Sequence, residues 1–89
     1  MLHMSKHKTI YDNEYRAVLN RLVQERKRLG LSQHEVAELT NLNQSEISKI
    51  ENFERRLDVL EFKKMLMAYR INTNEPLSNF VKSFFKLEP

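Results

Sequence analysis

The sequence contains no cysteine, only one glycine and only two prolines in its 89 residues. The lack of cysteine excludes both a disulfide framework and a thiolate metal site. So little glycine and proline argues against an all-β protein with many tight turns, whereas helices need few such residues. The composition therefore favours one small all-α domain with a single modest hydrophobic core.

Long hydrophobic stretches are also missing. The longest uninterrupted apolar run covers residues 65–69, which is far short of the roughly 20 residues that a membrane-spanning helix needs. Residues 1–8 lack the apolar core of a secretion signal, and we expect residues 1–11 to form a mobile basic arm. These features together predict a cytoplasmic protein with no membrane partner.

The residue types used in catalysis do not form a pattern that is typical of an active site. The sequence has no cysteine nucleophile, no glycine-rich phosphate loop and no cluster of aspartate, glutamate and histidine at metal-ligand spacing. His3 and His7 lie in the expected arm, and His34 lies near a helix start, where we expect it to be solvated. We therefore predict that the protein is not an enzyme and holds no cofactor and no metal.

Charge of neither sign dominates the sequence. Fifteen lysines and arginines stand against twelve aspartates and glutamates, which gives a formal net charge of +3. Such a mild excess does not identify a nucleic-acid-binding protein, because basic side chains usually form a solvated surface. Evidence for a partner must therefore come from motifs.

Hydrophobic periodicity predicts a helix near each end of the chain. Apolar residues repeat at helical spacing within residues 13–29, where Asp12 is a suitable N-cap and Gly30 a suitable left-handed stop. Pro76 marks the start of a last helix, and residues 77–85 carry an apolar stripe at positions i, i+3, i+4, i+7 and i+8.

Three further helix starts are predicted by capping boxes, in which an N-cap residue is followed three positions later by glutamate. These pairs are Ser32 with Glu35, Asn43 with Glu46, and Asp58 with Glu61. Each pair opens an apolar-periodic segment. The sequence therefore predicts an all-α, compact five-helix domain, in which residues 12–73 form the main unit and residues 74–89 provide a C-terminal helix.

Residues 33–52 have the pattern of a helix-turn-helix. Ala37 is small at the point where the two helices would cross, and Asn41 lies where the chain turns through the left-handed conformation. Ile47 and Ile50 are apolar and three positions apart, so they can hold the second helix against the core. A helix-turn-helix inserts its second helix into the DNA major groove, and this pattern therefore predicts DNA binding.

The outer face of that second helix is polar and carries no acid. Helical spacing places five residues on this side: Gln44, Ser45, Ser48, Lys49 and Asn52. Their amide groups suit adenine, the ammonium group suits guanine and the hydroxyl groups suit either base. The alternative is a solvated helix face without a ligand, and the surrounding pattern favours base contacts.

The runs Leu-Gly-Leu-Ser-Gln-His-Glu-Val-Ala (residues 29–37) and Gln-Ser-Glu-Ile-Ser-Lys-Ile-Glu-Asn (residues 44–52) resemble the helix-turn-helix of the Cro/lambda-repressor family, also called XRE-type. The resemblance extends over roughly residues 14–72. It implies a lambda-repressor-like fold and a sequence-specific transcriptional regulator, most often a repressor. Such proteins bind double-stranded DNA as homodimers on inverted repeats, and some members of the family are antitoxins.

The resemblance also implies roles for individual residues. Gln44, Ser45 and Lys49 match base-contacting positions, and Ser48 joins them on the polar strip. The matching phosphate contacts lie at the starts of the two helices and in the loop beyond them: Gln33, Asn43, Asn52, Arg55 and Arg56. Arg26 and Glu51 match an ion pair that joins the first helix to the end of the third.

Three positions depart from the usual residues of the family: Asn41 and Phe53 each stand where glycine is frequent, and Leu39 stands where a polar residue is common. Asn41 tolerates the left-handed conformation, so the change at the corner is acceptable. Phe53 is a larger departure, and we expect the loop after residue 52 to turn differently and to shift Arg55 and Arg56.

The apolar stripe of the last helix has two interpretations. The stripe consists of Leu77, Phe80, Val81, Phe84 and Phe85. It can close the core of the monomer or form the interface of a homodimer, and we favour the dimer because the apolar load is large for a small domain. An alternative function is a protein-interaction module, such as an antitoxin whose toxin-like partner docks on this stripe or on Leu39.

Overall fold

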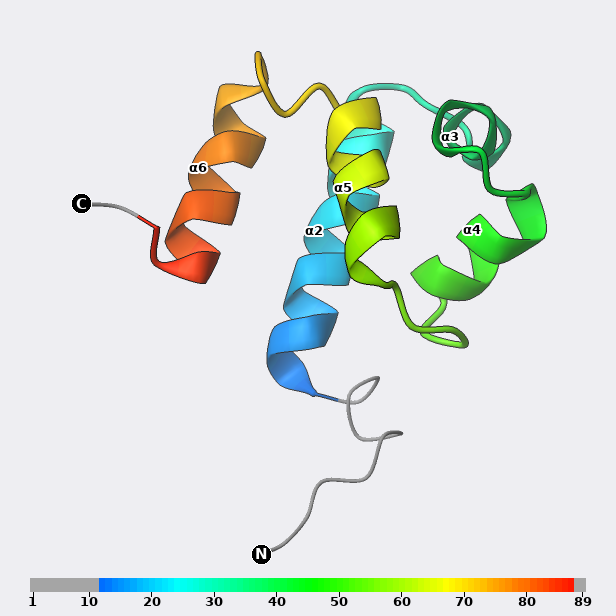
Figure 1. The fold of residues 1–89 in the computed structure, drawn as a ribbon, viewed down its shortest axis with the longest axis horizontal. Helices are drawn as coiled ribbons and strands as arrows, with labels where there is room; N and C mark the ends of the chain where they lie inside the picture. The colour runs from blue at the N-terminus through cyan, green and yellow to red at the C-terminus, as the bar shows by residue number, and fades with distance from the viewer. Residues whose placement is uncertain (1–11, 88–89) are drawn as a thin grey trace, which may run out of the picture.

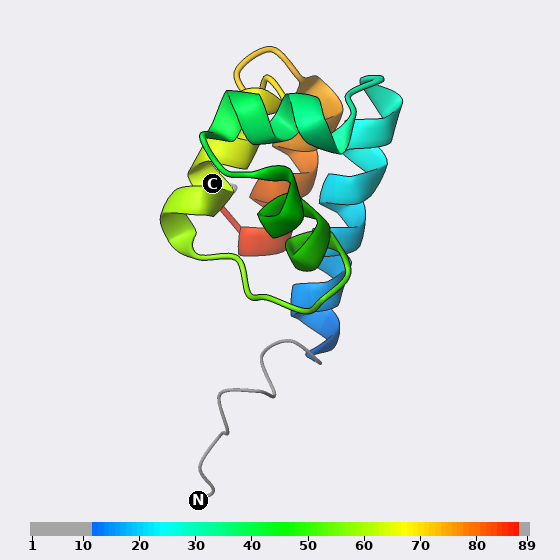
Figure 2. The ribbon, with the colours of Figure 1, turned by 90° about the vertical axis from the view of Figure 1, so that its right-hand side faces the viewer.

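The computed structural model describes residues 12–87, and within this range the chain is all-α. The helices are α2 (Asn13–Arg28), α3 (Gln33–Thr40), α4 (Gln44–Glu51), α5 (Val59–Ala68) and α6 (Glu75–Phe85). Helices α3 and α4 lie on one side of the molecule and α6 lies on the opposite side, with α2 and α5 between them (Figures 1 and 2). The expected basic arm, residues 1–11, lies outside the described residues.

The helix starts follow the capping residues that the sequence predicted. Asp12 caps α2 by accepting hydrogen bonds from the backbone N–H groups of Glu14 and Tyr15, at 2.8 and 3.3 Å. The reciprocal bonds of a capping box are present at the starts of α3, α4 and α5. Because each box satisfies two backbone groups that the helix itself leaves unpaired, these starts are defined locally.

The turn between α3 and α4 is made by a residue in the left-handed conformation. Asn41 has φ 61° and ψ 27°, and the N–H group of Leu42 donates to the carbonyl oxygen of Ala37 at 3.1 Å. Gly30 has φ 72° and ends the preceding helix in the same way. Both residues therefore end their helices in the left-handed conformation, as the sequence predicted.

The core draws on all five helices. Its buried members are Val18, Leu19, Leu22, Val36, Ala37, Ile47, Ile50, Met65, Tyr69 and Leu77. Ala37 is 4% exposed, as expected for the small residue at the crossing of α3 and α4. Burying a large apolar side chain stabilises a fold by about 1.5–3 kcal/mol, so this cluster, to which each of the five helices contributes, holds the domain together.

The structure corrects the interpretation of the α6 stripe at one position. Leu77 is 0% exposed within the single chain, so it cannot line an interface between folded copies, and its assignment to a dimer interface is wrong. Phe80, Val81 and Phe84 are half-buried against the same core. Phe85 stays 47% exposed. Helix α6 is therefore partly a core helix and partly an exposed one.

A polar cluster ties α6 to α2. The side-chain amide of Asn74 donates to Glu25 Oε2 at 2.6 Å, and its oxygen accepts from the backbone N–H of Leu77 at 3.2 Å. Arg28 donates to both Glu25 and Asn74. Glu25 is 1% exposed, and the bond from Arg28 lowers the pKa of its carboxyl.

Candidate nucleic-acid interface

Helix α4 presents its polar strip to solvent. Ile47 and Ile50 are completely buried on the inner side of the helix. The side chains of the strip lie on the opposite side, and Gln44, Ser45 and Lys49 are exposed while Ser48 is half-buried. The face that bears α3 and α4 is turned to the viewer in Figure 2. Over residues 12–87, the outer surface of α4 is therefore exposed and offers amide, hydroxyl and ammonium groups to a ligand.

The two acids of α4 are both engaged by groups of the protein. Glu46 Oε1 accepts from the backbone N–H of Asn43 at 3.0 Å, and Glu46 Oε2 lies 3.5 Å from Arg55 Nη2. Glu51 is held by an arginine and a glutamine from other helices, as described next. Because these carboxylates are neutralised within the protein, they do not oppose a polyanion at the polar strip.

The expected ion pair between Arg26 and Glu51 is present and has two hydrogen bonds. Arg26 Nε donates to Glu51 Oε2 at 2.7 Å and Arg26 Nη2 donates to Oε1 at 3.0 Å. Their side chains are only 12% and 7% exposed, so the pair is buried rather than solvated. Gln33 Nε2 also donates to Glu51 Oε1, at 3.0 Å. One carboxylate thus joins α2, α3 and α4, and its bonds raise the pKa of Arg26.

The geometry of residues 33–52 is that of a helix-turn-helix: two eight-residue helices, a left-handed corner and a polar outer face. A protein-family model described as helix-turn-helix matches residues 22–75. The chain belongs to the Cro/lambda-repressor (XRE-type) helix-turn-helix family. No curated protein sequence matches it.

Members of this helix-turn-helix family are DNA-binding transcription regulators and are generally not enzymes. The match includes the whole of α3, α4 and α5, so it contains both the buried Glu51 bonds and the exposed strip. Over residues 12–87, no helix is both long enough and apolar enough to cross a membrane. The XRE-type match supports DNA as a partner of this protein.

The loop after α4 keeps the left-handed turn that glycine favours, although the residue there is phenylalanine. Phe53 has φ 62°, and the N–H of Glu54 donates to the carbonyl oxygen of Lys49 at 2.8 Å, as in a Schellman motif. The guanidinium of Arg16 lies 4.4 Å from the centroid of the Phe53 ring, a cation–π contact that helps to hold this conformation. The expectation of a different turn is thus wrong for the backbone.

The two arginines of this XRE-type loop have different surroundings. Arg55 donates two hydrogen bonds to Glu61, at 2.9 and 2.7 Å, and it lowers the pKa of that carboxyl. Arg56 is exposed. The pairing of Arg55 with Glu61 was not predicted from the sequence, although Glu61 was recognised as part of a capping box. Asn74 was also not predicted as the N-cap of α6, although asparagine is a favoured N-cap residue and Pro76 marks the helix start.

The other residues proposed to meet phosphates lie around the ends of α3 and α4. Gln33 is the first residue of α3 and Asn43 is the N-cap of α4, where its side-chain oxygen accepts from the N–H of Glu46 at 2.8 Å. Asn52 ends α4 and its amide donates to Ser48 Oγ at 3.4 Å. Asn43 and Asn52 are exposed, and Gln33 is half-buried.

Proposed function

We propose that this protein is a sequence-specific transcriptional repressor that binds an inverted repeat as a homodimer and inserts α4 into the major groove. The observation that supports this function is the outer face of α4. It is exposed, it bears no free acid, and the bonds to Glu51 fix it against two other helices. A rigid helix with such a face suits direct contact with base edges.

The base contacts in this proposal come from the polar strip. Gln44 suits the N6/N7 edge of adenine and Lys49 suits the O6/N7 edge of guanine, while Ser45 and Ser48 can bond to either base. These four side chains differ in how exposed they are, and exposure decides how easily each can reach a base. Ser48 is half-buried and accepts from Asn52, so we assign the larger share of discrimination to Gln44 and Lys49.

The phosphate contacts would fix the register of α4 without selecting a sequence. Gln33, Asn43 and Asn52 offer amide groups at helix ends, where backbone N–H groups also attract anions. In the loop, Arg56 has an exposed guanidinium for a phosphate. Arg55 adds positive charge to the same loop. Its two hydrogen bonds to Glu61 also hold the loop against α5.

Selection from a random duplex library tests the function directly. We expect enrichment of an inverted repeat whose half-sites lie about one helical turn apart, because two copies related by a two-fold axis contact successive major grooves. Salt-sensitive binding with no enriched sequence would contradict sequence-specific regulation. It would then favour the protein-interaction alternative, in which a toxin-like protein is the main partner.

Replacing Lys49 by alanine tests the base contact. We expect a loss of about 1–3 kcal/mol on the selected site and a relaxed preference at one base pair of each half-site. The measurement is a titration of both the selected duplex and a scrambled duplex at one salt concentration. An equal loss on both duplexes would show that Lys49 contacts phosphate and not a base.

A further inference from the structure

Tyr69 carries a buried hydroxyl that has no hydrogen-bond partner among residues 12–87. The residue is 0% exposed and belongs to the same core cluster as Ile50 of α4. A buried polar group without a partner is costly, and native proteins rarely keep one. Phenylalanine has the same ring without the hydroxyl, so the core retains a donor that no described residue uses.

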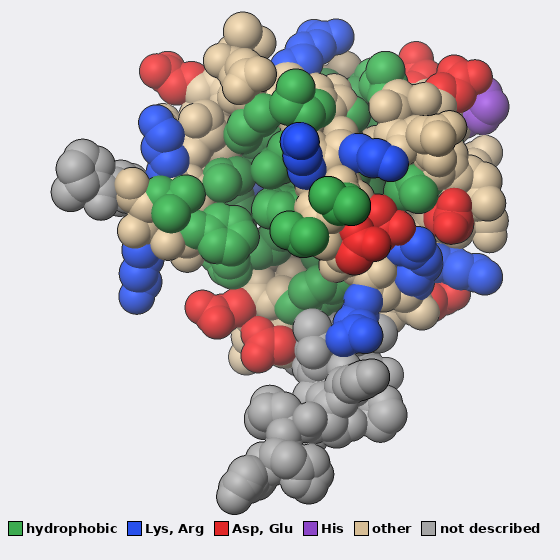
Figure 3. Space-filling model, viewed as in Figure 1, with side chains coloured by type: hydrophobic (Ala, Val, Ile, Leu, Met, Phe, Trp, Pro, Cys, Tyr) green, Lys and Arg blue, Asp and Glu red, His purple; other side chains and the backbone are tan. Residues whose placement is uncertain are grey.

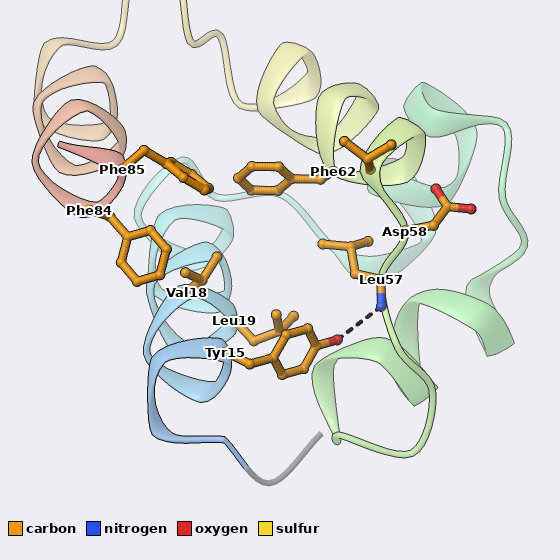
Figure 4. A pocket seen from close by; sticks show the side chains of 9 residues that line it. Tyr15, Val18, Leu19, Leu57, Asp58, Phe62, Phe84 and Phe85 are labelled. Carbon is orange, nitrogen blue, oxygen red and sulfur yellow. Dashed lines mark hydrogen bonds between the residues drawn. The ribbon is translucent and has the colours of Figure 1, made fainter. Parts of the chain in front are cut away.

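Tyr15 shows the arrangement that a tyrosine hydroxyl usually has in this protein's apolar surroundings. It lines a groove formed by residues of α2, α5 and α6, and Figure 3 shows hydrophobic side chains gathered over the face that α5 and α6 present to the viewer. Its hydroxyl nevertheless accepts from the backbone N–H of Leu57 at 2.9 Å (Figure 4). Tyr69 therefore differs from Tyr15 in a way that apolar surroundings alone do not explain.

The surroundings of Tyr69 hold its ring beside a carboxylate. Its backbone N–H donates to the carbonyl oxygen of Met65 at 2.9 Å, and its carbonyl oxygen accepts from the amide of Asn74 at 2.8 Å. Burial raises the pKa of the Tyr69 hydroxyl, the negative charge of Glu51 raises it further, and the positive charge of Arg26 lowers it. The hydroxyl therefore keeps its proton and is a donor within electrostatic reach of Glu51.

Gln33 has two acceptors to serve under the proposed function. Its Nε2 donates to Glu51 Oε1 at 3.0 Å, and the Glu51 side chain is only 7% exposed, so this amide is turned inward. A DNA phosphate would lie outside the protein surface, at the start of α3, where Gln33 is half-buried. To donate to that phosphate the amide must turn outward, and Glu51 Oε1 then loses one of its donors.

We propose that Tyr69 is a positioning residue for α4, and that its hydroxyl takes the place of Gln33 on Glu51 when Gln33 donates to a DNA phosphate. The inference rests on the proposed function, which assigns the phosphate contact to Gln33. In the free protein Gln33 bonds to Glu51, and the Tyr69 hydroxyl has no partner among the described residues. In the complex Gln33 bonds to phosphate and Tyr69 bonds to Glu51. Helix α4 then stays tied to α2 through Arg26 and to α5 through Tyr69.

This exchange of donors makes DNA binding relieve a cost of the free protein. The unpaired hydroxyl of Tyr69 destabilises the free state but not the complex. A group that is bonded in only one of two states shifts the equilibrium toward that state. Tyr69 therefore favours the complex without touching DNA. Its removal should weaken DNA binding while leaving the free protein at least as stable as before.

Replacing Tyr69 by phenylalanine tests the step that involves DNA. We expect the dissociation constant for the selected duplex to rise about tenfold for each copy bound, which is the effect of one hydrogen bond to a charged group. The matched control is Thr40→Val, because Thr40 is also buried but its hydroxyl already donates to the carbonyl oxygen of Val36 at 2.7 Å. Thr40→Val should bind the duplex as tightly as the wild type. Equal affinity of Tyr69→Phe and the wild type would overturn the proposal.

Thermal unfolding of the free protein gives a second test that needs no DNA. In Gln33→Ala, Glu51 has lost its amide donor, so Tyr69 should bond to Glu51 already in the free state. Tyr69→Phe should then lower the melting temperature by about 4–8 °C in the Gln33→Ala background, because it removes a bond. In the wild-type background it should leave the melting temperature unchanged or raise it, because it removes an unpaired hydroxyl. The same effect in both backgrounds would overturn the proposal.

NMR of protein whose tyrosines carry ¹³C at Cζ observes the hydroxyl itself, since the shift of this carbon responds to hydrogen bonding. The resonance of Tyr69 is the one that disappears in Tyr69→Phe. We expect it to move when the selected duplex is added, and to stand near the same new position in Gln33→Ala without DNA. A Tyr69 resonance that keeps its position when the protein is saturated with duplex would overturn the proposal.

The two proposals fail in different ways. An enriched inverted repeat that wild type and Tyr69→Phe bind equally well would leave the regulatory function intact and overturn the exchange. Equal losses of affinity from Tyr69→Phe in the wild-type and Gln33→Ala backgrounds would do the same, since Tyr69 would then act independently of Gln33. A protein that enriches no duplex but unfolds as expected in both backgrounds would overturn the function and leave Tyr69 as the second donor to Glu51.

Discussion

At the scale of single residues, three arginine side chains pair with carboxylates of the protein. Arg26 holds Glu51, Arg28 holds Glu25, and Arg55 holds Glu61. Only the first pair was predicted, because a family resemblance implied it. The other pairs could not be predicted, since Arg28 lies three positions and Arg55 six positions from its acid, and the sequence does not say which side chain turns inward.

The bonds around Glu51 should be worth more to stability than those of an exposed pair. Arg26→Met and Glu51→Leu should each lower the free energy of unfolding by about 3 kcal/mol, since each leaves a buried charge unpaired. The double variant should lose much less than the sum, because it removes both charges. Chemical denaturation of the four proteins measures this coupling.

The pair of His34 and Glu38 is the control for that cycle. It spans 3.4 Å, but its side chains are 67% and 70% exposed. Replacing His34 by alanine should leave the midpoint of unfolding unchanged, because solvated pairs contribute little. If the two single variants at Arg26 and Glu51 were as harmless as this one, the buried bonds would not stabilise the position of α4.

Glu25 should make stability depend on pH. Its pKa in the folded protein lies below the ordinary value of 4.5, so the folded state binds the proton less readily than the unfolded state does. The stabilisation is therefore fully present above pH 4.5 and is lost as the pH falls through the folded pKa. Glu25→Gln should lose about 1–3 kcal/mol at pH 7 and show a weaker loss on acidification.

Thermal unfolding of both proteins at pH 7 and at a series of lower pH values measures this difference. The exposed Glu54 provides the control, and Glu54→Gln should follow the wild-type curve. A Glu25→Gln variant whose stability falls with pH as steeply as that of the wild type would show that other carboxyl groups govern acid unfolding.

At the scale of helices, starts were better predicted than the contacts between helices. The capping boxes at Ser32, Asn43 and Asp58 are local, so the sequence contains both partners of each bond. Phe53 was not predicted to adopt φ 62°, because the Arg16 contact that covers its ring comes from another helix. Leu77 was misassigned for a similar reason, since periodicity shows an apolar face but not what covers it.

The left-handed backbone at position 41 should make the free energy of unfolding depend on which residue stands there. It is exposed and has φ 61°, so its replacement changes backbone strain with little loss of packing. Asn41→Ala should lower the free energy of unfolding by about 1 kcal/mol, whereas Asn41→Gly should be neutral or slightly stabilising. Urea denaturation compares them with Asn72→Ala, a control at an exposed turn residue without positive φ. Equal effects of alanine and glycine at position 41 would contradict this account.

At the scale of the whole molecule, the arrangement of charge matters more than its total. A net charge of +3 is modest, and sequence alone could not show on which side the basic groups gather. The fold places the loop with Arg56 after α4, while α6, which bears Lys82, lies on the opposite side of the molecule (Figure 1). A DNA-binding surface at α4 should therefore contact phosphate through Arg56 and not through Lys82.

Arg56→Ala and Lys82→Ala each remove one positive charge. Comparing the two variants therefore separates the effect of a direct phosphate contact from the effect of the net charge. Binding that neutralises a phosphate releases condensed counterions, and each lost contact reduces the slope of log K against log salt by about 0.9. We expect Arg56→Ala to reduce the slope by about 1.8 for a dimer, with Lys82→Ala unchanged. The measurement is fluorescence anisotropy of the selected duplex over a series of salt concentrations. Equal reductions in both variants would mean that DNA responds to the total charge of the protein, and the proposed surface around α4 would lose its support.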